Sequence, residues 1–324
     1  MTRRKLDKLI IYLKKIGYQI YGPTKENNEI LIKQIKKPSQ LLLDNRLPLY
    51  SFKEFFLPPN EVLFYYKNNN FQENLFQKSL ALFGLSVFDL KALLLFRQVF
   101  EKDFYFQERF KNILIIGFGP SPFINGQFKI WRRKYEEDVL EHLQFDLFLI
   151  KRGKDYQVFT GTRLGQKILD KFGYQNYEHI QFTGYLKEEG LEPYFIEIKE
   201  KIKKMTPNHP FWQELAQRCI ECGKCSIVCP TCFCFDIKDE LISKNKGKRI
   251  RYWTSCFYHN FSEIAGGKKF LNTTAERIYF WYYHKFVRLL DEYSFPGCVG
   301  CGRCSQVCPV GIDVIKNLQR IKNI

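Results

Sequence analysis

The residues with the most evident chemistry are the eleven cysteines, all of which lie in the last 106 residues of the 324-residue chain. Six of them fall within the sixteen residues CIECGKCSIVCPTCFC that begin at Cys219. Thiolates bind soft metals, or they pair as disulfides in oxidising compartments. The number is odd, and charged residues interrupt any apolar signal segment at the N-terminus, so we expect a cytoplasmic protein with reduced thiols. Metal binding is therefore the leading use of these cysteines.

Two runs of cysteines repeat one spacing, C-x2-C-x2-C-x3-C followed by proline. The first run ends at Pro230 and the second at Pro309. This spacing is typical of bacterial two-cluster ferredoxins, in which the last cysteine of each run ligates the cluster of the other run. We therefore predict two [4Fe-4S] clusters, one on Cys219, Cys222, Cys225 and Cys308 and one on Cys298, Cys301, Cys304 and Cys229. Structural zinc, the alternative for C-x2-C pairs, is disfavoured by two complete quartets that both end in proline.

Glycine follows the second cysteine of each run, as Gly223 and Gly302. A tight bend is expected there, and backbone N–H groups can approach cluster sulfurs where no Cβ intervenes. Crossed ligation requires both runs to lie in one compact unit although 68 residues separate Cys229 from Cys298, and we expect those residues to fold as helices around the clusters. Cubanes carry one electron each, so the predicted function is electron relay, and the chain alone is not expected to turn over a substrate.

Three cysteines are not used by this assignment, namely Cys232, Cys234 and Cys256. One interpretation is that they are small buried side chains that pack near the clusters. The other is an additional metal site, with His259 as a possible fourth ligand. Both interpretations stay open. The spacing alone does not argue strongly for the metal site, because two cysteines separated by one residue chelate a metal less commonly than two separated by two residues.

The predicted fold class is α+β. Residues 1–205 read as a mixed α/β domain, and residues 206–324 as an α-helical two-cluster ferredoxin domain. Apolar patterning predicts an amphipathic helix near the N-terminus, strands at 29–35, 62–66 and 112–118, a helix at 86–100 and a hairpin at 145–161 that turns at 152–155. Further helices are expected at 210–218 and 272–293.

The net charge of +17 raises the possibility of a nucleic-acid-binding protein stabilised by zinc. The positive excess is spread over the chain, however, and its densest run, residues 244–251, is interpreted as a solvated loop. The stretch IIGFGPSPF resembles the start of a dinucleotide-binding loop, but Pro120 and Pro122 disfavour that function. No stretch reaches the 18 apolar residues of a membrane helix. We therefore expect no nucleic-acid partner and no membrane insertion.

Three stretches together resemble a known family. They are CIECGKCSIVCPTCFCFDIKDE, RYWTSCFYHNFSEIAGGKKFLNTTAERIYFWYYHKF and CVGCGRCSQVCPVGIDV. They are similar to the dicluster iron–sulfur β subunits of cytosolic [NiFe] hydrogenases (sulfhydrogenases) and to the corresponding iron–sulfur subunits of anaerobic sulfite reductase. The resemblance implies a hetero-oligomer in which the chain relays electrons between a partner that binds flavin and NAD(P) and the catalytic subunit of a hydrogenase or sulfite reductase. It carries the eight cysteines over as cluster ligands, and Cys232, Cys234 and Cys256 also match family positions.

The N-terminal half resembles the same family more weakly. Family members carry cysteines there that look like ligands of an extra cluster, whereas this chain has Val87-Phe88-Asp89 and Gly119-Pro120-Ser121. That cluster is expected to be missing here. The hydrogenase interpretation is preferred because the sequence shows no sulfite-specific feature and hydrogenase-type subunits are the broader group. A component of a heterodisulfide-reductase-like complex is a further alternative.

Overall fold

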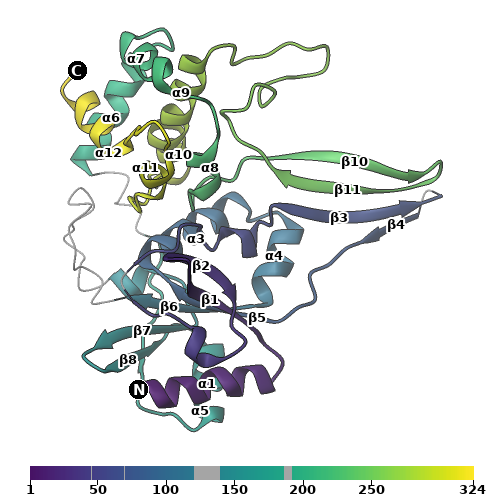
Figure 1. Ribbon diagram of the computed structural model, residues 1–324, viewed down its shortest axis with the longest axis vertical. Coiled ribbons are helices and arrows are strands. Elements are labelled where there is room, and N and C mark those ends of the chain that lie inside the picture. The colour runs from purple at the N-terminus through teal and green to yellow at the C-terminus, as the bar shows by residue number, and fades with distance from the viewer. Residues whose placement is uncertain (45, 69, 120–138, 186–191) are drawn as a thin grey trace. The chain divides into compact units, whose positions relative to one another are not determined.

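The computed structural model describes the whole chain except residues 45, 69, 120–138 and 186–191 (Figure 1). It divides into two compact units. Unit 1 contains residues 1–56 and 75–185, and unit 2 contains residues 57–74 and 186–324. Unit 2 thus includes two segments, 57–74 and 186–205, that lie before the predicted domain boundary. The α+β class, with an α/β region before a cysteine-rich region, is confirmed.

Unit 1 is built on a seven-stranded sheet. Its strands are β1 Gln19–Glu26, β2 Glu29–Gln34, β5 Leu80–Leu85, β6 Ile113–Gly119, β7 Leu147–Arg152, β8 Asp155–Thr160 and β9 Glu178–His179, in the order β2-β1-β5-β6-β7-β8-β9. Strands β1, β5, β6 and β7 are parallel, while β2 and β8 pair antiparallel to β1 and β7. Every residue of β6 is buried, as expected for a central parallel strand covered on both faces.

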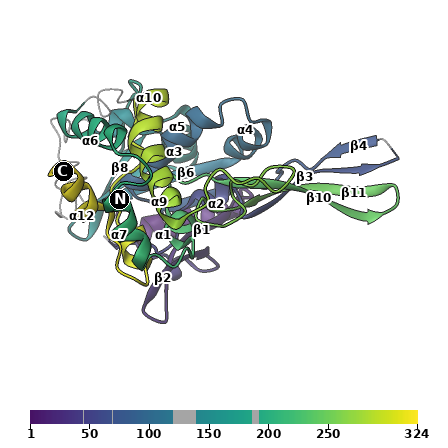
Figure 2. The same cartoon turned by 90° about the horizontal axis from the view of Figure 1, so that it is seen from above.

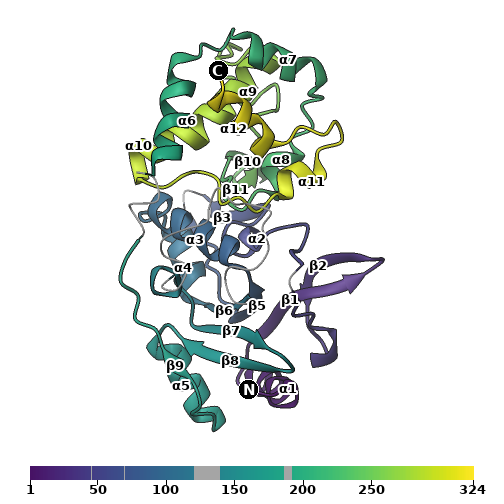
Figure 3. The ribbon, with the colours of Figure 1, turned by 90° about the vertical axis from the view of Figure 1, so that its left-hand side faces the viewer.

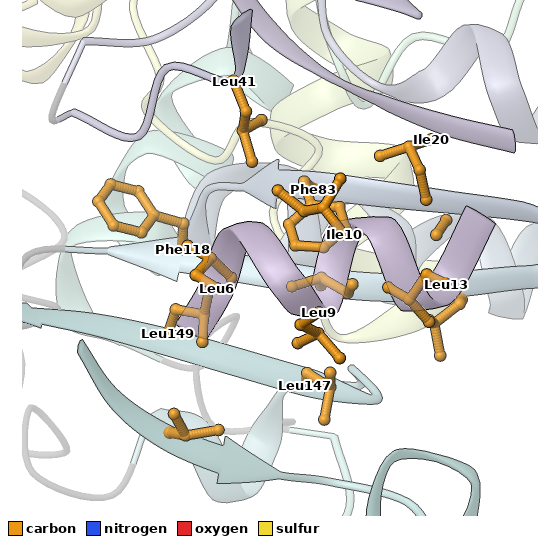
Figure 4. Packing of buried hydrophobic residues seen from close by; sticks show 14 of the residues in the cluster. Leu6, Leu9, Ile10, Leu13, Ile20, Leu41, Phe83, Phe118, Leu147 and Leu149 are labelled. Atoms are coloured by element: carbon orange, nitrogen blue, oxygen red, sulfur yellow. The ribbon is translucent and has the colours of Figure 1, made fainter. Parts of the chain in front are cut away.

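Helices cover this sheet and supply its core. They are α1 Arg3–Lys15, α2 Lys53–Phe56, α3 Val87–Val99, α4 Phe104–Lys111 and α5 Arg163–Phe172, with short 3-10 turns η1 Pro38–Gln40 and η3 Val139–His142. Helix α1 buries one apolar stripe against the strands, and Figure 4 shows Leu6, Leu9 and Leu13 of this helix near Leu147 and Leu149 of β7. The predicted amphipathic first helix is confirmed, as are the strands, the helix at 86–100 and the hairpin.

Unit 2 gathers the helices that flank the cysteine runs (Figure 3). The elements are α6 Pro193–Lys204, α7 Pro210–Arg218, α8 Lys224–Val228, α9 Thr274–Tyr283, a π-helix η5 His284–Arg288, α10 Leu289–Tyr293, α11 Arg303–Val307 and α12 Val314–Lys322. Its apolar core joins Ile198 of α6, Trp212 of α7, Phe286 of η5 and Leu318 of α12. None of the described helices has both the length and the apolar character required to cross a membrane.

Unit 2 also contains a four-stranded antiparallel sheet (Figure 2). Its strands are β3 Asn60–Lys67, β4 Asn70–Glu73, β10 Phe235–Ser243 and β11 Lys246–Trp253, in the order β10-β11-β3-β4. The expectation that all residues between the cysteine runs are helical is therefore wrong for residues 235–253. The interpretation of residues 244–251 as a loop is also wrong, because most of them form β11.

Cross-strand charge pairs explain why the basic run forms a strand. Arg249 lies 2.7 Å from Asp239 on β10, and Lys248 lies 3.0 Å from Glu240. Arg251 is buried and pairs with Glu61 on β3, 190 residues away in sequence. Opposite charges on facing positions stabilise an antiparallel ladder. Three of the five basic side chains of this run thus have acidic partners in the same sheet.

Candidate functional site

The first cysteine run forms a loop, a short helix and an extended exit. Cys219 ends α7, Cys225 lies in α8, and Cys229 is the extended residue that follows α8. Gly223 begins α8 with φ +69° in the left-handed region. A Cβ at this glycine would lie 2.6 Å from Tyr258 and 2.9 Å from the Ser255 hydroxyl. The predicted tight bend is present, and only glycine fits it without displacing its neighbours.

The second run repeats this conformation. Gly302 begins α11 with φ +73°, and Cys308 is the extended residue that follows α11. The two short helices α8 and α11 pack against each other. A backbone N–H from Ile312 donates to the sulfur of Cys308 over 3.3 Å. Donors of this kind stabilise the negative charge of a thiolate ligand.

The packing brings cysteines of both runs around one cavity. Cys219, Cys222 and Cys225 line it together with Cys304 and Cys308. The remaining walls are mainly apolar and include Phe257, Ile278, Trp281, Tyr282, Ile312 and Val314. The other thiols also meet, since Cys229 lies within electrostatic range of Cys298 and Cys304. Cysteines of the two runs are thus neighbours in space, and the crossed ligation stays a prediction.

The buried thiols of Cys225 and Cys298 are poor acids as long as no metal compensates them. Burial raises the pKa of Cys225 to about 12, and neighbouring cysteines act in the same direction. Burial likewise raises the pKa of Cys298 to about 12, although Lys285 opposes the shift. Metal ligands must be thiolates, and bound cations supply the positive charge that a group of buried thiolates requires. The donor set therefore fits a cationic iron cluster.

The three cysteines outside the two quartets, Cys232, Cys234 and Cys256, lie close to other cysteines. The pKa of Cys232 is raised first by a hydrogen bond with Cys229 and then by burial. The pKa of Cys256 is raised first by a hydrogen bond with Cys234 and then by burial. His259 is placed elsewhere, since its ring lies 3.1 Å from Glu221 and its side chain is 71% exposed. The additional metal site stays a prediction.

The spacing of the donors bears on the kind of metal centre. Within the described part of the chain, no three His, Cys, Asp or Glu side chains are grouped as closely as a single ion requires. A cubane presents separate irons to separate thiols, so its ligands lie farther apart than those of one zinc ion.

Buried cations near the cysteines were not predicted from the sequence, among them Lys285 and Arg277. Lys285, inside the stretch YFWYYHKF that looks like core, is buried and contacts Cys229. Arg277 is buried and binds Glu221 between the first two cysteines. The available signal was a cation at a core-facing position of an aromatic helix, because such a charge requires a partner.

Comparison with known proteins agrees with this geometry. Residues 218–312 match the model of the 4Fe-4S dicluster domain family. These residues form a 4Fe-4S dicluster domain. The domain provides for two 4Fe-4S clusters, as the cysteine spacing predicts. The zinc-stabilised alternative has no support in this match.

The similarity extends beyond the dicluster domain. The β subunit of sulfhydrogenase 2 from Pyrococcus furiosus is 27% identical over 328 residues, which cover 96% of this chain and 94% of that protein. Together with the dicluster domain, this confirms the resemblance to hydrogenase β-type iron–sulfur subunits. No solved structure matches the chain.

The N-terminal positions that differ from the family have a partly visible structural role. Asp89 lies in the first turn of α3, where it forms a reciprocal capping box with Ser86. This residue therefore stabilises the start of a helix. Pro120 and Ser121 lie outside the described residues, as does Pro122 of the suspected dinucleotide loop.

Proposed function

We propose that this chain is the electron-relay component of a cytoplasmic hydrogenase complex. It would pass single electrons between a [NiFe] catalytic subunit and a partner that binds flavin and NAD(P). The dicluster domain and the similarity to a sulfhydrogenase β subunit support an iron–sulfur electron-transfer role in a hetero-oligomer. The observation that carries the proposal is the cavity in which Cys308 of the second run joins Cys219, Cys222 and Cys225 of the first.

The ligand assignment follows the same neighbours. One cluster would be held by Cys219, Cys222, Cys225 and Cys308, and the other by Cys298, Cys301, Cys304 and Cys229. The clusters supply reversible one-electron chemistry when bound. The chain's own residues hold the thiols apart at fixed positions, and aromatic walls such as Trp281 and Tyr282 keep water away from the cavity. Because neighbouring runs share both clusters, the two redox centres would lie close together.

Selective loss of one cluster tests the crossed assignment. The complex would be purified anaerobically, analysed for iron and acid-labile sulfide and studied by EPR after reduction. About eight irons and eight sulfides per copy of this chain are expected for its two cubanes, in addition to the metal of its partners. Cys308→Ser and Cys222→Ser should alter the same EPR signal, while Cys229→Ser and Cys301→Ser should alter the other. Pairing of Cys308 with Cys301 instead would refute the crossing, and zinc without sulfide would refute the electron-relay function.

The same preparation tests the identity of the catalytic partner. Hydrogen gas should reduce both clusters in the intact complex if the partner is a hydrogenase. NADPH or NADH should reduce them through the flavin-binding partner. Sulfite-dependent reoxidation with no response to hydrogen would instead assign the chain to a sulfite reductase. Cys256→Ser tests the additional metal site, because eight irons should remain in place if Cys256 belongs to no cluster.

A further inference from the structure

Lys285 is a buried lysine whose ammonium group donates hydrogen bonds to the cysteine loops. The residue is 3% exposed. Its ammonium group lies 3.5 Å from the sulfur of Cys229, 2.9 Å from the hydroxyl of Thr231 and 2.6 Å from the carbonyl oxygen of Gly297. An ammonium has three N–H donors and no acceptor. Three acceptors at these distances therefore suit the charged form of the side chain.

The backbone of unit 2 holds this lysine in place from both directions. Lys285 lies in the π-helix η5, a distortion that often marks functional positions in helices. The N–H of Gly297 donates to the carbonyl of Lys285 over 2.8 Å, while the Gly297 carbonyl accepts from its ammonium. A Cβ at Gly297 would lie 2.9 Å from the Cα of Lys285. Gly297 immediately precedes Cys298, so Lys285 joins the exit of the first run to the start of the second.

Within the described part of the chain, the charge of Lys285 has no acidic partner. Among the residues that the structure describes, no carboxylate forms an ion pair with it, and the other contact of its ammonium is the ring of Trp281, 5.2 Å away. A buried charge without a counter-charge is strongly unfavourable. The anionic groups within reach are the cysteine sulfurs, namely Cys229 by hydrogen bond and Cys232, Cys298 and Cys304 by electrostatic interaction. The thiolate ligands are thus the counter-charge.

The buried arginine near the first run has a counter-charge of its own. Arg277 binds the carboxylate of Glu221 and the carbonyl of Leu271. The Glu221 carboxylate neutralises its charge. The two cysteine runs have the same spacing and conformation, so this difference in neighbouring charge distinguishes their electrostatic environments. Lys285 therefore adds more net positive charge near Cys229 and Cys298 than Arg277 adds near the first run, because Glu221 neutralises Arg277.

We propose that Lys285 is a positioning residue that raises the reduction potential of the cluster held by Cys298, Cys301, Cys304 and Cys229. The proposal rests on the ligand assignment under Proposed function. Reduction adds one electron to the cluster and its thiolates, and a nearby positive charge stabilises the reduced form. Net charge and hydrogen bonds to sulfur are among the factors that set cluster potentials. Electrons would therefore settle preferentially on this cluster, which gives the relay an internal direction.

Redox titration of the anaerobically purified complex, followed by EPR, tests this proposal. Lys285→Met, which keeps the length but removes the charge, should disfavour reduction of one cluster at least tenfold, about 59 mV for a one-electron couple. That signal should be the one altered by Cys301→Ser. Lys285→Arg should restore the wild-type potential. The control is Arg288→Met, which removes an exposed charge of the same π-helix and should shift neither potential by as much.

The outcomes separate a tuning role from a structural one. Lys285→Met protein with eight irons and unchanged potentials would overturn the inference while leaving the relay function intact. An equal shift of both clusters would also overturn it. Lys285→Gln is a second neutral variant in case the methionine variant fails to fold. Loss of the cluster in both neutral variants, with retention in Lys285→Arg, would show that the charge is needed to retain the cluster. That result would overturn the proposed effect on its reduction potential. Wild-type protein without iron would refute the proposed function itself.

Discussion

The Nε atom of Arg277 donates a 2.6 Å hydrogen bond to the carboxylate of Glu221, which connects helix α9 to the loop between Cys219 and Cys222. The guanidinium is 3% exposed and also donates to the carbonyl of Leu271. Glu221 has a positive φ of 54°, an unusual conformation for this residue type. The ion pair therefore holds a strained ligand loop against the helical core of unit 2.

Removal of Arg277 should loosen the first cluster. Arg277→Ala leaves the Glu221 carboxylate without its buried partner, at a cost of about 3 kcal/mol. We expect faster loss of the cluster at Cys219, Cys222, Cys225 and Cys308, measured as decay of its EPR signal in the presence of an iron chelator. The control Arg320→Ala removes an exposed ion pair with Glu214, and exposed pairs of this kind contribute little to stability. Equal decay in the two variants would contradict the role of Arg277.

Gly223 should not tolerate a side chain. Gly223→Ala combines a positive φ with a Cβ that would lie 2.6 Å from Tyr258, so iron content after reconstitution should fall well below that of the wild type. Gly266 offers a matched comparison, because it also has a positive φ (+91°) but has open space around its Cβ position. Gly266→Ala should cost only about 1 kcal/mol of backbone strain and retain the clusters. Similar losses in both variants would show that backbone strain alone is decisive.

His284 should make the protein sensitive to acid. Burial, followed by the nearby Lys285 and Arg288, lowers the pKa of His284 to about 4. Above pH 6.5 the ring is neutral in both the folded and the unfolded chain, so its contribution to stability is fully present. Between pH 6.5 and 4 the unfolded chain binds a proton that the folded chain rejects, and stability falls by up to about 3 kcal/mol.

Thermal unfolding of the anaerobic protein at pH 7.5 and pH 5 measures this effect. His284→Phe fits the aromatic contacts with Phe233 and Phe280 and cannot titrate. The drop in melting temperature between the two pH values should therefore be smaller in this variant than in the wild type. An identical drop in both proteins would mean that His284 binds its proton equally well in the folded and the unfolded chain.

Asp146 should be an anchor of unit 1. Its carboxylate accepts hydrogen bonds from the N–H of Ile115 on β6 and from the hydroxyl of Thr162 at the start of α5. Burial raises the pKa of Asp146, and these two hydrogen bonds oppose that shift. Asp146→Ala leaves the buried Ile115 N–H without this acceptor and should cost about 2 kcal/mol.

Amide hydrogen exchange reports this change locally. The Ile115 amide should exchange faster in Asp146→Ala than in the wild type. Asp170→Ala is the control, because it removes an exposed carboxylate. Within the described residues, the hydrogen bond given for this carboxylate comes from the hydroxyl of Tyr177. Unchanged exchange at Ile115 in both variants would exclude the anchoring role.

Short-range patterns predicted much of the fold. The helix at 210–218 coincides with α7, and the buried strand at 112–118 corresponds to β6. Such elements are specified by neighbouring residues: apolar periodicity, a proline at the helix start and continuous burial of a parallel strand. The sheet of unit 2 was missed because β11 pairs with β3, whose residues lie far away in the chain and belong by sequence to the N-terminal half.

The sequence by itself determined the chemistry of this protein. Two repeated cysteine spacings and the glycines within them specify two iron–sulfur sites through local backbone geometry. Only the tertiary structure brought Lys285 against Cys229 and Arg277 against Glu221. Those neighbours depend on the packing of a helix that lies between the two runs. A buried charge can be recognised as functional only when its partners are known, because desolvation and electrostatic attraction both depend on distance in space and not on separation along the chain.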